Sequence, residues 1–141
     1  MEYKTVSEIE NEIIEEFSVF DEWIDKYEYI IDLGKSLPVI DEKEKSDSNL
    51  IKGCQSRVWL SSSFNEGKIF FSADSDAIIT KGIISLLIRV YNGRTPQEIL
   101  SSDFSFVEKI GLKENLSPTR ANGLVAMIKQ IKSYALGYNL K

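Results

Sequence analysis

Hydrophobic side chains in the first third of the chain recur at helical spacing. Residues 5–20 and 21–33 each carry one apolar face, which predicts two amphipathic helices. The apolar positions are Val6, Ile9, Ile13, Phe17 and Phe20 in the first, and Trp23, Tyr27, Ile30 and Ile31 in the second. Thr5 and Glu8 have the spacing of a capping box. Because glycine commonly follows the last helical turn, we expect the second helix to stop at Gly34.

In the middle of the chain the spacing changes to alternation. Residues 57–64 and 68–73 are rich in β-branched and aromatic side chains, and residues 65–67 between them are typical of a hairpin turn. One side of the first strand carries Val58, Leu60, Ser62 and Phe64, and the other carries Arg57, Trp59, Ser61 and Ser63. We therefore expect one covered and one wetter face. Residues 49–52 could form a further short strand.

Helical spacing returns after the hairpin. A strongly apolar segment runs to about residue 91, with candidate N-caps at residues 74–76. Its stripe consists of Ile79, Ile83, Leu86 and Val90, and Asn92 and Gly93 end it. Thr95, Pro96 and Glu98 predict the start of a short helix, and another short helix is expected at about 103–110. Ser117 and Pro118 open the last helix, whose inward residues are Leu124, Ile128, Ile131 and Ala135.

The order of these elements defines the expected fold class. Two helices, then strands, then more helices form segregated blocks, which favour an α+β fold. We expect a small antiparallel sheet of about three strands, covered by helices. No linker or repeat divides the sequence, so residues 1–141 are expected to form a single domain.

Composition removes several kinds of chemistry. The chain has no histidine and one cysteine, Cys54. An internal disulfide, a Cys-His dyad, a Ser-His-Asp triad and the usual structural zinc sites are therefore excluded. We expect no metal and no other cofactor.

The expected location is the cytoplasm. The first residues lack a signal-peptide pattern, and the longest apolar stretch, 83–90, is interrupted by Ser85 and Arg89. That stretch is too short to span a bilayer. A reducing compartment also suits a free thiol.

Charge is divided unevenly along the chain. Residues 1–50 have a net charge of −10, and residues 51–141 have a net charge of +5. An acidic region of this size disfavours nucleic acid as the main partner and suits a basic protein surface. A solvated acidic helix face is the simpler alternative.

Cys54 is the candidate reactive residue, and its surroundings leave two interpretations open. Gly53 allows a tight turn that could aim backbone N–H groups at the sulfur, and Lys52 and Arg57 add positive potential. Both effects would favour the nucleophilic thiolate. The alternative is a small buried residue without chemistry, which is common for a free cysteine. A thiolate without a histidine partner suits attack on another sulfur better than hydrolysis.

The sequence around Cys54 resembles the active-site segment of SufE-type sulfur acceptor proteins of iron–sulfur cluster assembly. The resemblance runs in order through residues 23–29, 33–38, 53–56 with 58–60, 71–77 with 81–82, 91–96 and 116–124. Asn115 stands where the family often has histidine, so no chemistry is expected of that position here. Ile24 replaces a commonly acidic residue, which weakens any detailed expectation of a docking surface there.

The resemblance implies a role and a set of residues. Such proteins have helices packed on a small curved sheet, accept sulfane sulfur from a pyridoxal-phosphate-dependent cysteine desulfurase (SufS-like), and pass it to an iron–sulfur scaffold complex (SufBCD-like). Cys54 is then the acceptor, and the residues expected to bind the transferred sulfur are Gly53, Gln55, Ser56 and Arg120.

Alternatives remain for the protein and for individual residues. The chain could be a regulatory binding module with an inert cysteine. Arg120 could stabilise an anionic sulfur near a helix start, or could be a structural arginine that pairs with an acid such as Asp74. Asp74 and Asp76 are expected to act as helix caps.

Overall fold

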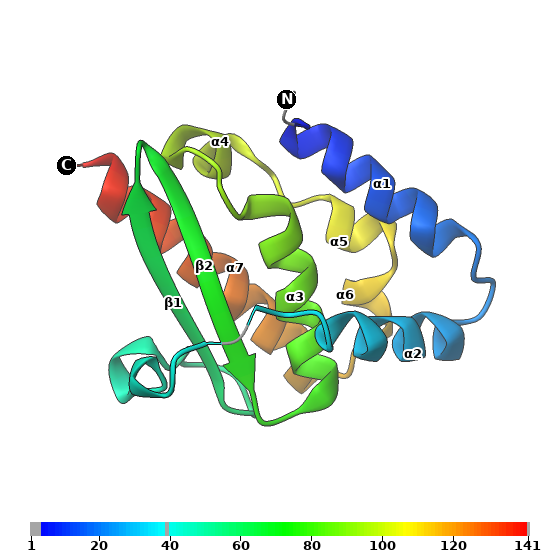
Figure 1. Ribbon diagram of the computed structural model, residues 1–141. Coiled ribbons are helices and arrows are strands. Elements are labelled where there is room, and N and C mark those ends of the chain that lie inside the picture. The colour runs from blue at the N-terminus through cyan, green and yellow to red at the C-terminus, as the bar shows by residue number, and fades with distance from the viewer. Residues whose placement is uncertain (1–3, 39, 141) are drawn as a thin grey trace.

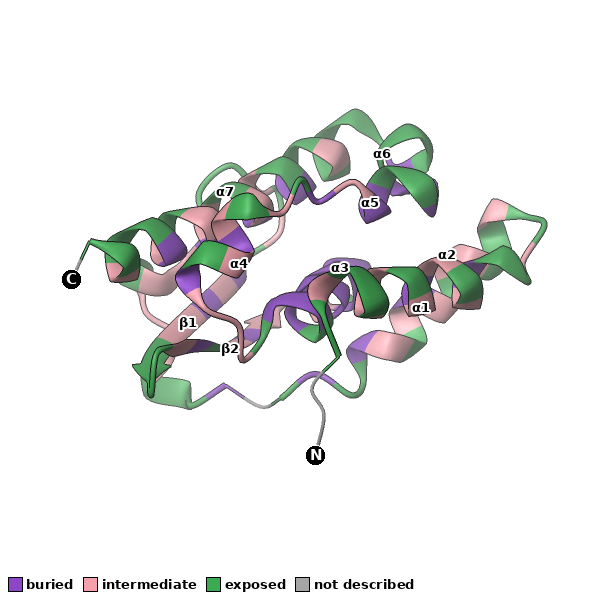
Figure 2. Cartoon of the chain, turned by 90° about the horizontal axis from the view of Figure 1, so that it is seen from above, coloured by how far each residue is buried: buried purple, intermediate pink, exposed green. Residues whose placement is uncertain are grey.

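The computed structural model describes residues 4–38 and 40–140 and confirms the α+β fold (Figure 1). Its elements are α1 (Val6–Ser18), α2 (Trp23–Gly34), the 3-10 turns η1 (Glu42–Glu44) and η2 (Asp47–Asn49), β1 (Val58–Asn65), β2 (Lys68–Ser75), α3 (Ile78–Tyr91), α4 (Pro96–Ser101), α5 (Phe106–Lys109), α6 (Leu112–Asn115) and α7 (Pro118–Asn139). Figure 2 shows α3 in the centre, with α1 and α2 on one side and the hairpin on the other. No helix in the described residues is both long and apolar enough to cross a membrane.

The hairpin forms as its alternation predicts. β1 and β2 pair antiparallel, with Asn65 opposite Lys68. Glu66 and Gly67 between them have φ of 50° and 79°, the positive values of the turn that matches the natural twist of a hairpin. Val58 and Leu60 are fully buried, whereas the opposite face is only partly covered. The prediction of one covered and one wetter face is confirmed.

The prediction of a third strand is wrong. Leu50 forms one isolated bridge with Trp59, and the Ile51 amide donates to the Val58 carbonyl at 2.8 Å. The sheet that the described residues form has two strands. Pairing stops there because residues 47–49 form a 3-10 turn and the backbone at Gly53 takes a φ of 94°.

Two glycines set the distance between α2 and α3. A Cβ on Gly82 would lie 2.1 Å from the Ile30 carbonyl oxygen, and one on Gly34 would lie 2.9 Å from the Gly82 nitrogen. The second helix does end at Gly34, but this residue is not among the glycines with positive φ. Its observed role is therefore close helix packing.

The core helix α3 begins without the side-chain cap that the sequence suggested. Ala77 occupies the N-cap position. Asp74 instead forms ion pairs with Lys45 at 2.7 Å and Lys81 at 3.4 Å, and Asp76 accepts a hydrogen bond from the Arg57 amide at 3.0 Å. The capping prediction is wrong because tertiary contacts recruit both carboxylates. The predicted apolar stripe of α3 is buried throughout.

The remaining helices follow the predicted boundary signals in most places. The capping boxes at Thr5 and Thr95 are both formed, and Ser117 caps α7. The helix expected at about 103–110 shrinks to α5, because Phe104 has a φ of 58° and interrupts it. The short helix α6 was not predicted.

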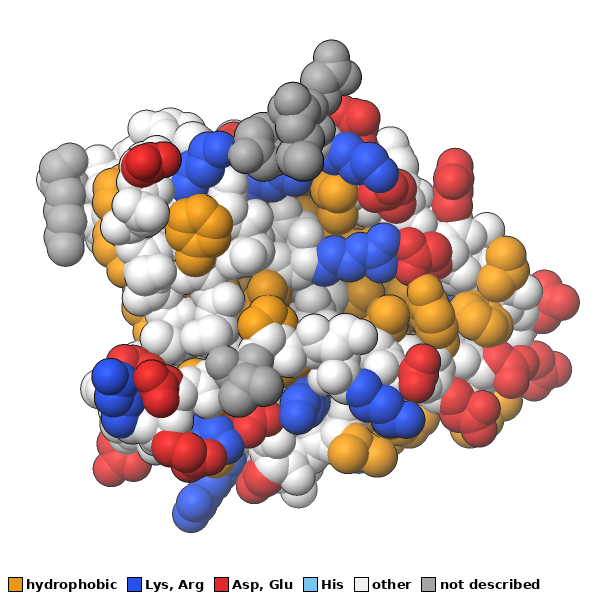
Figure 3. Space-filling model, in the orientation of Figure 1, with side chains coloured by type: hydrophobic (Ala, Val, Ile, Leu, Met, Phe, Trp, Pro, Cys, Tyr) orange, Lys and Arg blue, Asp and Glu red, His pale blue; other side chains and the backbone are white. Residues whose placement is uncertain are grey.

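The uneven charge of the sequence is visible on the surface. Figure 3 shows acidic side chains gathered over the end of the molecule where α1 meets α2, and acidic and basic side chains together over the 3-10 turns. The acidic side chains near the junction of α1 and α2 therefore lie on the exposed surface.

Candidate functional site

Cys54 lies in the loop between Leu50 and the start of β1, and the loop rests on α7. A left-handed backbone at Gly53, with φ of 94°, produces the turn. A Cβ on Gly53 would lie 3.4 Å from the Ala126 methyl group of α7. The loop is therefore shaped by a residue that tolerates positive φ and is supported by the helix.

The thiol of Cys54 points toward the start of α7. It is half-buried, and its Sγ donates to the carbonyl oxygen of Gly123 at 3.7 Å. A Cβ on Gly123 would lie 3.5 Å from Sγ. The absence of a side chain at Gly123 keeps the space beside the sulfur open.

A small cavity of about 50 Å³ adjoins the thiol. It is lined by Cys54, Gln55, Ser56, Thr80, Ile83, Thr119, Arg120, Gly123 and Met127. The lining thus comes from the loop, from α3 and from the first turns of α7. A cavity of ~10–15 Å³ already admits one water molecule, so there is room beside Sγ for one further atom of the size of sulfur.

Burial raises the pKa of the Cys54 thiol. Of the two interpretations that the sequence left open, this direction favours the buried thiol over the thiolate stabilised by the neighbouring glycine and cations. Lys52 and Arg57 are exposed, and the polar contact of Sγ in the described structure is with a carbonyl oxygen, which favours the protonated form. In this conformation Cys54 is a shielded thiol rather than an activated thiolate.

Hydrogen bonds hold the two ends of the Cys54 loop. The Ile51 amide donates to the Val58 carbonyl and so joins the two ends to each other. Next to Val58, the Arg57 amide donates to the Asp76 carboxylate at 3.0 Å, and the Asp76 amide donates to the Arg57 carbonyl at 3.2 Å. Asp76 is thus a latch between the loop and the start of α3.

Arg120 reaches the mouth of the cavity because of the way α7 begins. The Ser117 side chain accepts a hydrogen bond from the Arg120 amide at 3.3 Å, which fixes the first turn of the helix. The exposed guanidinium lies 5.9 Å from the centre of the Tyr27 ring, a cation–π contact with α2. The alternative pairing of Arg120 with Asp74 is wrong, because Asp74 pairs with Lys45 and Lys81.

The structure brings together most of the residues expected at the site. Gln55, Ser56 and Arg120 share the cavity with Cys54, whereas Gly53 lies outside it. The other lining residues were not predicted for the site: Thr80, Ile83, Thr119, Gly123 and Met127. A polar residue within the apolar pattern of α3 was an available signal for Thr80, and Gly123 lies within the segment 116–124 that carries the family resemblance.

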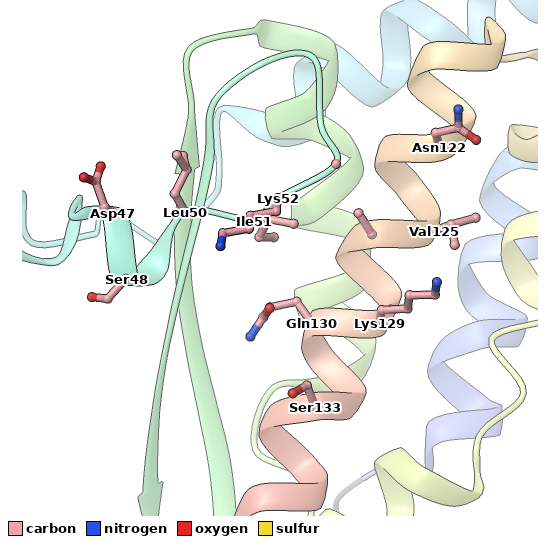
Figure 4. Close-up of a pocket in the computed structure, with 12 residues that line it drawn as sticks. Asp47, Ser48, Leu50, Ile51, Lys52, Asn122, Val125, Lys129, Gln130 and Ser133 are labelled. Carbon is pink, nitrogen blue, oxygen red and sulfur yellow. The ribbon is translucent and has the colours of Figure 1, made fainter.

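A larger groove runs along the other side of the loop. It has a volume of about 880 Å³ and lies between residues 47–53 and α7 (Figure 4). Gly53 borders the groove, but Cys54 is not part of its lining. The groove is therefore separate from the space that the thiol faces.

Within the described ranges, no group of three or more Cys, Asp or Glu side chains is placed to hold a metal ion. The chemistry offered by the site is that of one thiol in a small, partly polar cavity.

Comparison with known proteins gives this site a family. The profile of the SufE family, described as an Fe-S metabolism associated domain, matches residues 11–135. An uncharacterised SufE-like protein of Rhizobium etli is 42% identical over 130 residues, which cover 89% of this chain and 88% of that protein. A second, from Rhizobium meliloti, is 39% identical over 132 residues, with coverage of 90% and 94%.

A solved structure supports the fold. The solution structure of a hypothetical protein from Thermus thermophilus matches this chain with a TM-score of 0.77 and 17% sequence identity. The match covers 94% of this chain and 97% of that protein's chain. At that identity the likeness concerns the fold alone. The sequence matches carry the assignment: this chain belongs to the SufE family, and its role is one of sulfur transfer in iron–sulfur metabolism.

Proposed function

We propose that this protein is a sulfur carrier that receives sulfane sulfur as a persulfide on Cys54. The donor is a pyridoxal-phosphate-dependent cysteine desulfurase of the SufS type, and the recipient is an iron–sulfur scaffold complex of the SufBCD type. The observation that carries the proposal is the half-buried thiol of the chain's one cysteine beside a cavity of about 50 Å³. Family membership supports the same role.

The transfer is a displacement at sulfur. The Cys54 thiol gives its proton to solvent, and the thiolate attacks the outer sulfur of the donor's Cys–S–SH group. The sulfur–sulfur bond of the donor breaks, and the donor cysteine leaves as a thiolate that is protonated in turn. Cys54–S–SH is formed without any net oxidation or reduction, so the step needs neither histidine nor a cofactor on this chain.

The inward thiol requires the loop to move before transfer. Sγ faces Gly123 and the cavity, and burial raises the pKa of Cys54, so the free protein resists reaction. Docking of the desulfurase would turn the loop outward and expose the sulfur to a more polar environment, which lowers the pKa. After transfer, return of the loop would place the outer sulfur in the cavity.

The remaining site residues have supporting roles in this proposal. Arg120 at the cavity mouth supplies positive charge toward an anionic sulfur. Gln55 and Ser56 supply hydrogen-bonding side chains from the loop itself. Gly53 provides the positive φ that permits the turn.

A regulatory module with an inert cysteine is the second candidate. The raised pKa and partial burial of Cys54 favour it, because both reduce reactivity. In this case the protein would alter desulfurase turnover by binding alone.

A Cys54→Ser variant separates the two functions. Desulfurase turnover is measured with cysteine as substrate and either wild-type protein or the variant added, together with binding of each to the desulfurase. A carrier predicts that the variant still binds but gives less stimulation than wild type. Full stimulation by Cys54→Ser would instead establish the regulatory module.

A further inference from the structure

Thr80 is an unusual residue for its place in α3. It is the one buried polar side chain in the described part of the chain, with 7% of its surface exposed. Its neighbours Ile79, Ile83 and Ile84 are buried and apolar. A hydroxyl group in such surroundings calls for a partner, because polar groups buried in a protein are nearly always hydrogen-bonded.

The hydroxyl of Thr80 has no hydrogen-bond partner among residues 4–38 and 40–140. No fully enclosed side-chain nitrogen or oxygen of those residues lacks a partner. The Thr80 hydroxyl is therefore not fully enclosed, and the space that Thr80 lines is the cavity beside Cys54. An unpaired hydroxyl in such apolar surroundings is unfavourable unless a group in the cavity bonds to it.

The polarity of the cavity suits a persulfide better than a thiol. In the unloaded protein Cys54 donates to the Gly123 carbonyl. A deprotonated persulfide has no proton to donate, and its outer sulfur needs donors instead. Ile83 and Met127 offer no donor to the cavity. The other donors that line it lie on exposed or partly exposed residues: Gln55, Ser56, Thr119 and Arg120. Thr80 supplies an O–H from the buried wall.

We propose that Thr80 is a persulfide-binding residue, whose hydroxyl donates a hydrogen bond to the outer sulfur of Cys54–S–S⁻ when the loop is closed. The inference rests on the proposed function, since it concerns the fate of a persulfide on Cys54. It adds a role for α3: the helix holds the sulfur within the protein and shields it from reductants between donor and acceptor.

The test uses a pair of substitutions in the full-length protein. Thr80→Val keeps the shape of the side chain and removes the hydroxyl, and Thr80→Ser keeps the hydroxyl. Each protein is loaded with inorganic polysulfide, which places a persulfide on Cys54 without a desulfurase, and loading is followed by intact mass. This makes the result independent of whether a desulfurase acts as donor.

The first measurement is the rate at which dithiothreitol removes the added sulfur. We expect removal to be about tenfold faster in Thr80→Val than in wild type, the factor typical of one hydrogen bond to a charged group. Thr80→Ser should stay close to wild type. Equal rates in all three proteins, or no loading of the wild type by polysulfide, would overturn the inference.

The second measurement separates binding of the persulfide from a purely structural role. Because a hydrogen bond to the charged form lowers the pKa, alkylation of the persulfide should have a higher midpoint pH in Thr80→Val. In the unloaded state the same variant should keep or raise its urea midpoint, since it loses an unpaired hydroxyl. A lower urea midpoint with an unchanged alkylation profile would assign Thr80 to packing and contradict the proposal.

Discussion

The Sγ of Cys54 donates to the main-chain carbonyl of Gly123, so the sulfur of this chain faces α7 instead of solvent. The two residues are separated by 69 positions in the sequence, and the first turns of a helix bring them together. We therefore expect this contact, with the burial that accompanies it, to reduce the reactivity of the thiol in the free protein.

The first prediction concerns the reactivity of the free thiol. Because burial raises the pKa of Cys54, a smaller fraction is thiolate at any pH near neutrality. Alkylation by iodoacetamide should be slower in the native protein than in urea, and its midpoint pH should lie above that of the unfolded chain. A native rate equal to the unfolded rate would show that the thiol is not shielded.

The same shift affects stability. With a folded pKa above the unfolded value, Cys54 contributes stability at pH values below the unfolded pKa, and this contribution is lost as pH rises through the folded pKa. The difference in unfolding free energy between wild type and Cys54→Ala should therefore shrink as pH rises above about 8.5. A difference that grows over that range would contradict the burial of the thiol.

The third prediction concerns the backbone at Gly53. A Gly53→Ala substitution should destabilise the protein by about 1–2 kcal/mol in urea unfolding, because φ is 94° there. It should also change the alkylation rate of Cys54. Gly67→Ala is the matched control: φ is 79° and nothing lies within 4 Å of the added Cβ. The control should show a similar loss of stability with an unchanged alkylation rate of Cys54. If the alkylation rate changes in both variants, the effect does not arise from the Cys54 loop.

The fourth prediction concerns the latch between Asp76 and Arg57. Asp76→Ala removes the carboxylate that accepts the Arg57 amide, so the loop should open more often. Native alkylation of Cys54 should become several-fold faster, and the Arg57 amide should exchange faster by NMR. Asp76→Asn retains an acceptor oxygen and should remain near wild type. If Asp76→Ala leaves both rates unaltered, the latch does not limit opening.

Most of the fold was predictable because its signals are local. Helical spacing, the capping boxes at Thr5 and Thr95 and the two-residue turn at Glu66 and Gly67 act within a few residues, and the structure contains each of them. The errors arose where distant contacts decide. Residues 49–52 were expected to form a strand, but Leu50 makes a single bridge. Asp74 was expected to cap α3, but it forms ion pairs with Lys45 and Lys81 instead.

The site was predictable only in part for the same reason. Cys54 could be singled out because the chain has one cysteine and the surrounding residues resemble a family. Its burial could not, since α3 and α7 provide the walls of the cavity. Thr80 and Gly123 carry weak sequence signals that assign no role, and it is the fold that places both around the cavity beside Cys54.

The fifth prediction tests the close packing of α2 and α3. Gly82→Ala should destabilise the protein by about 3 kcal/mol or more, the upper range for overpacking, because the new Cβ would lie 2.1 Å from the Ile30 carbonyl oxygen. Gly137→Ala is the control in α7, where nothing lies within 4 Å. It should stabilise by about 0.5–1 kcal/mol through helix propensity. Urea unfolding measures both changes in stability. If Gly82→Ala leaves the free energy of unfolding unchanged, the close packing of α2 on α3 is contradicted.

The most direct test of the carrier function is the intact mass of the protein after incubation with a cysteine desulfurase and cysteine. Our account predicts a mass increase of one sulfur atom on wild type, its removal by a reductant, and no increase on Cys54→Ser. If the wild-type mass stays unchanged while the desulfurase turns over, Cys54 does not accept sulfur, and the central claim is contradicted.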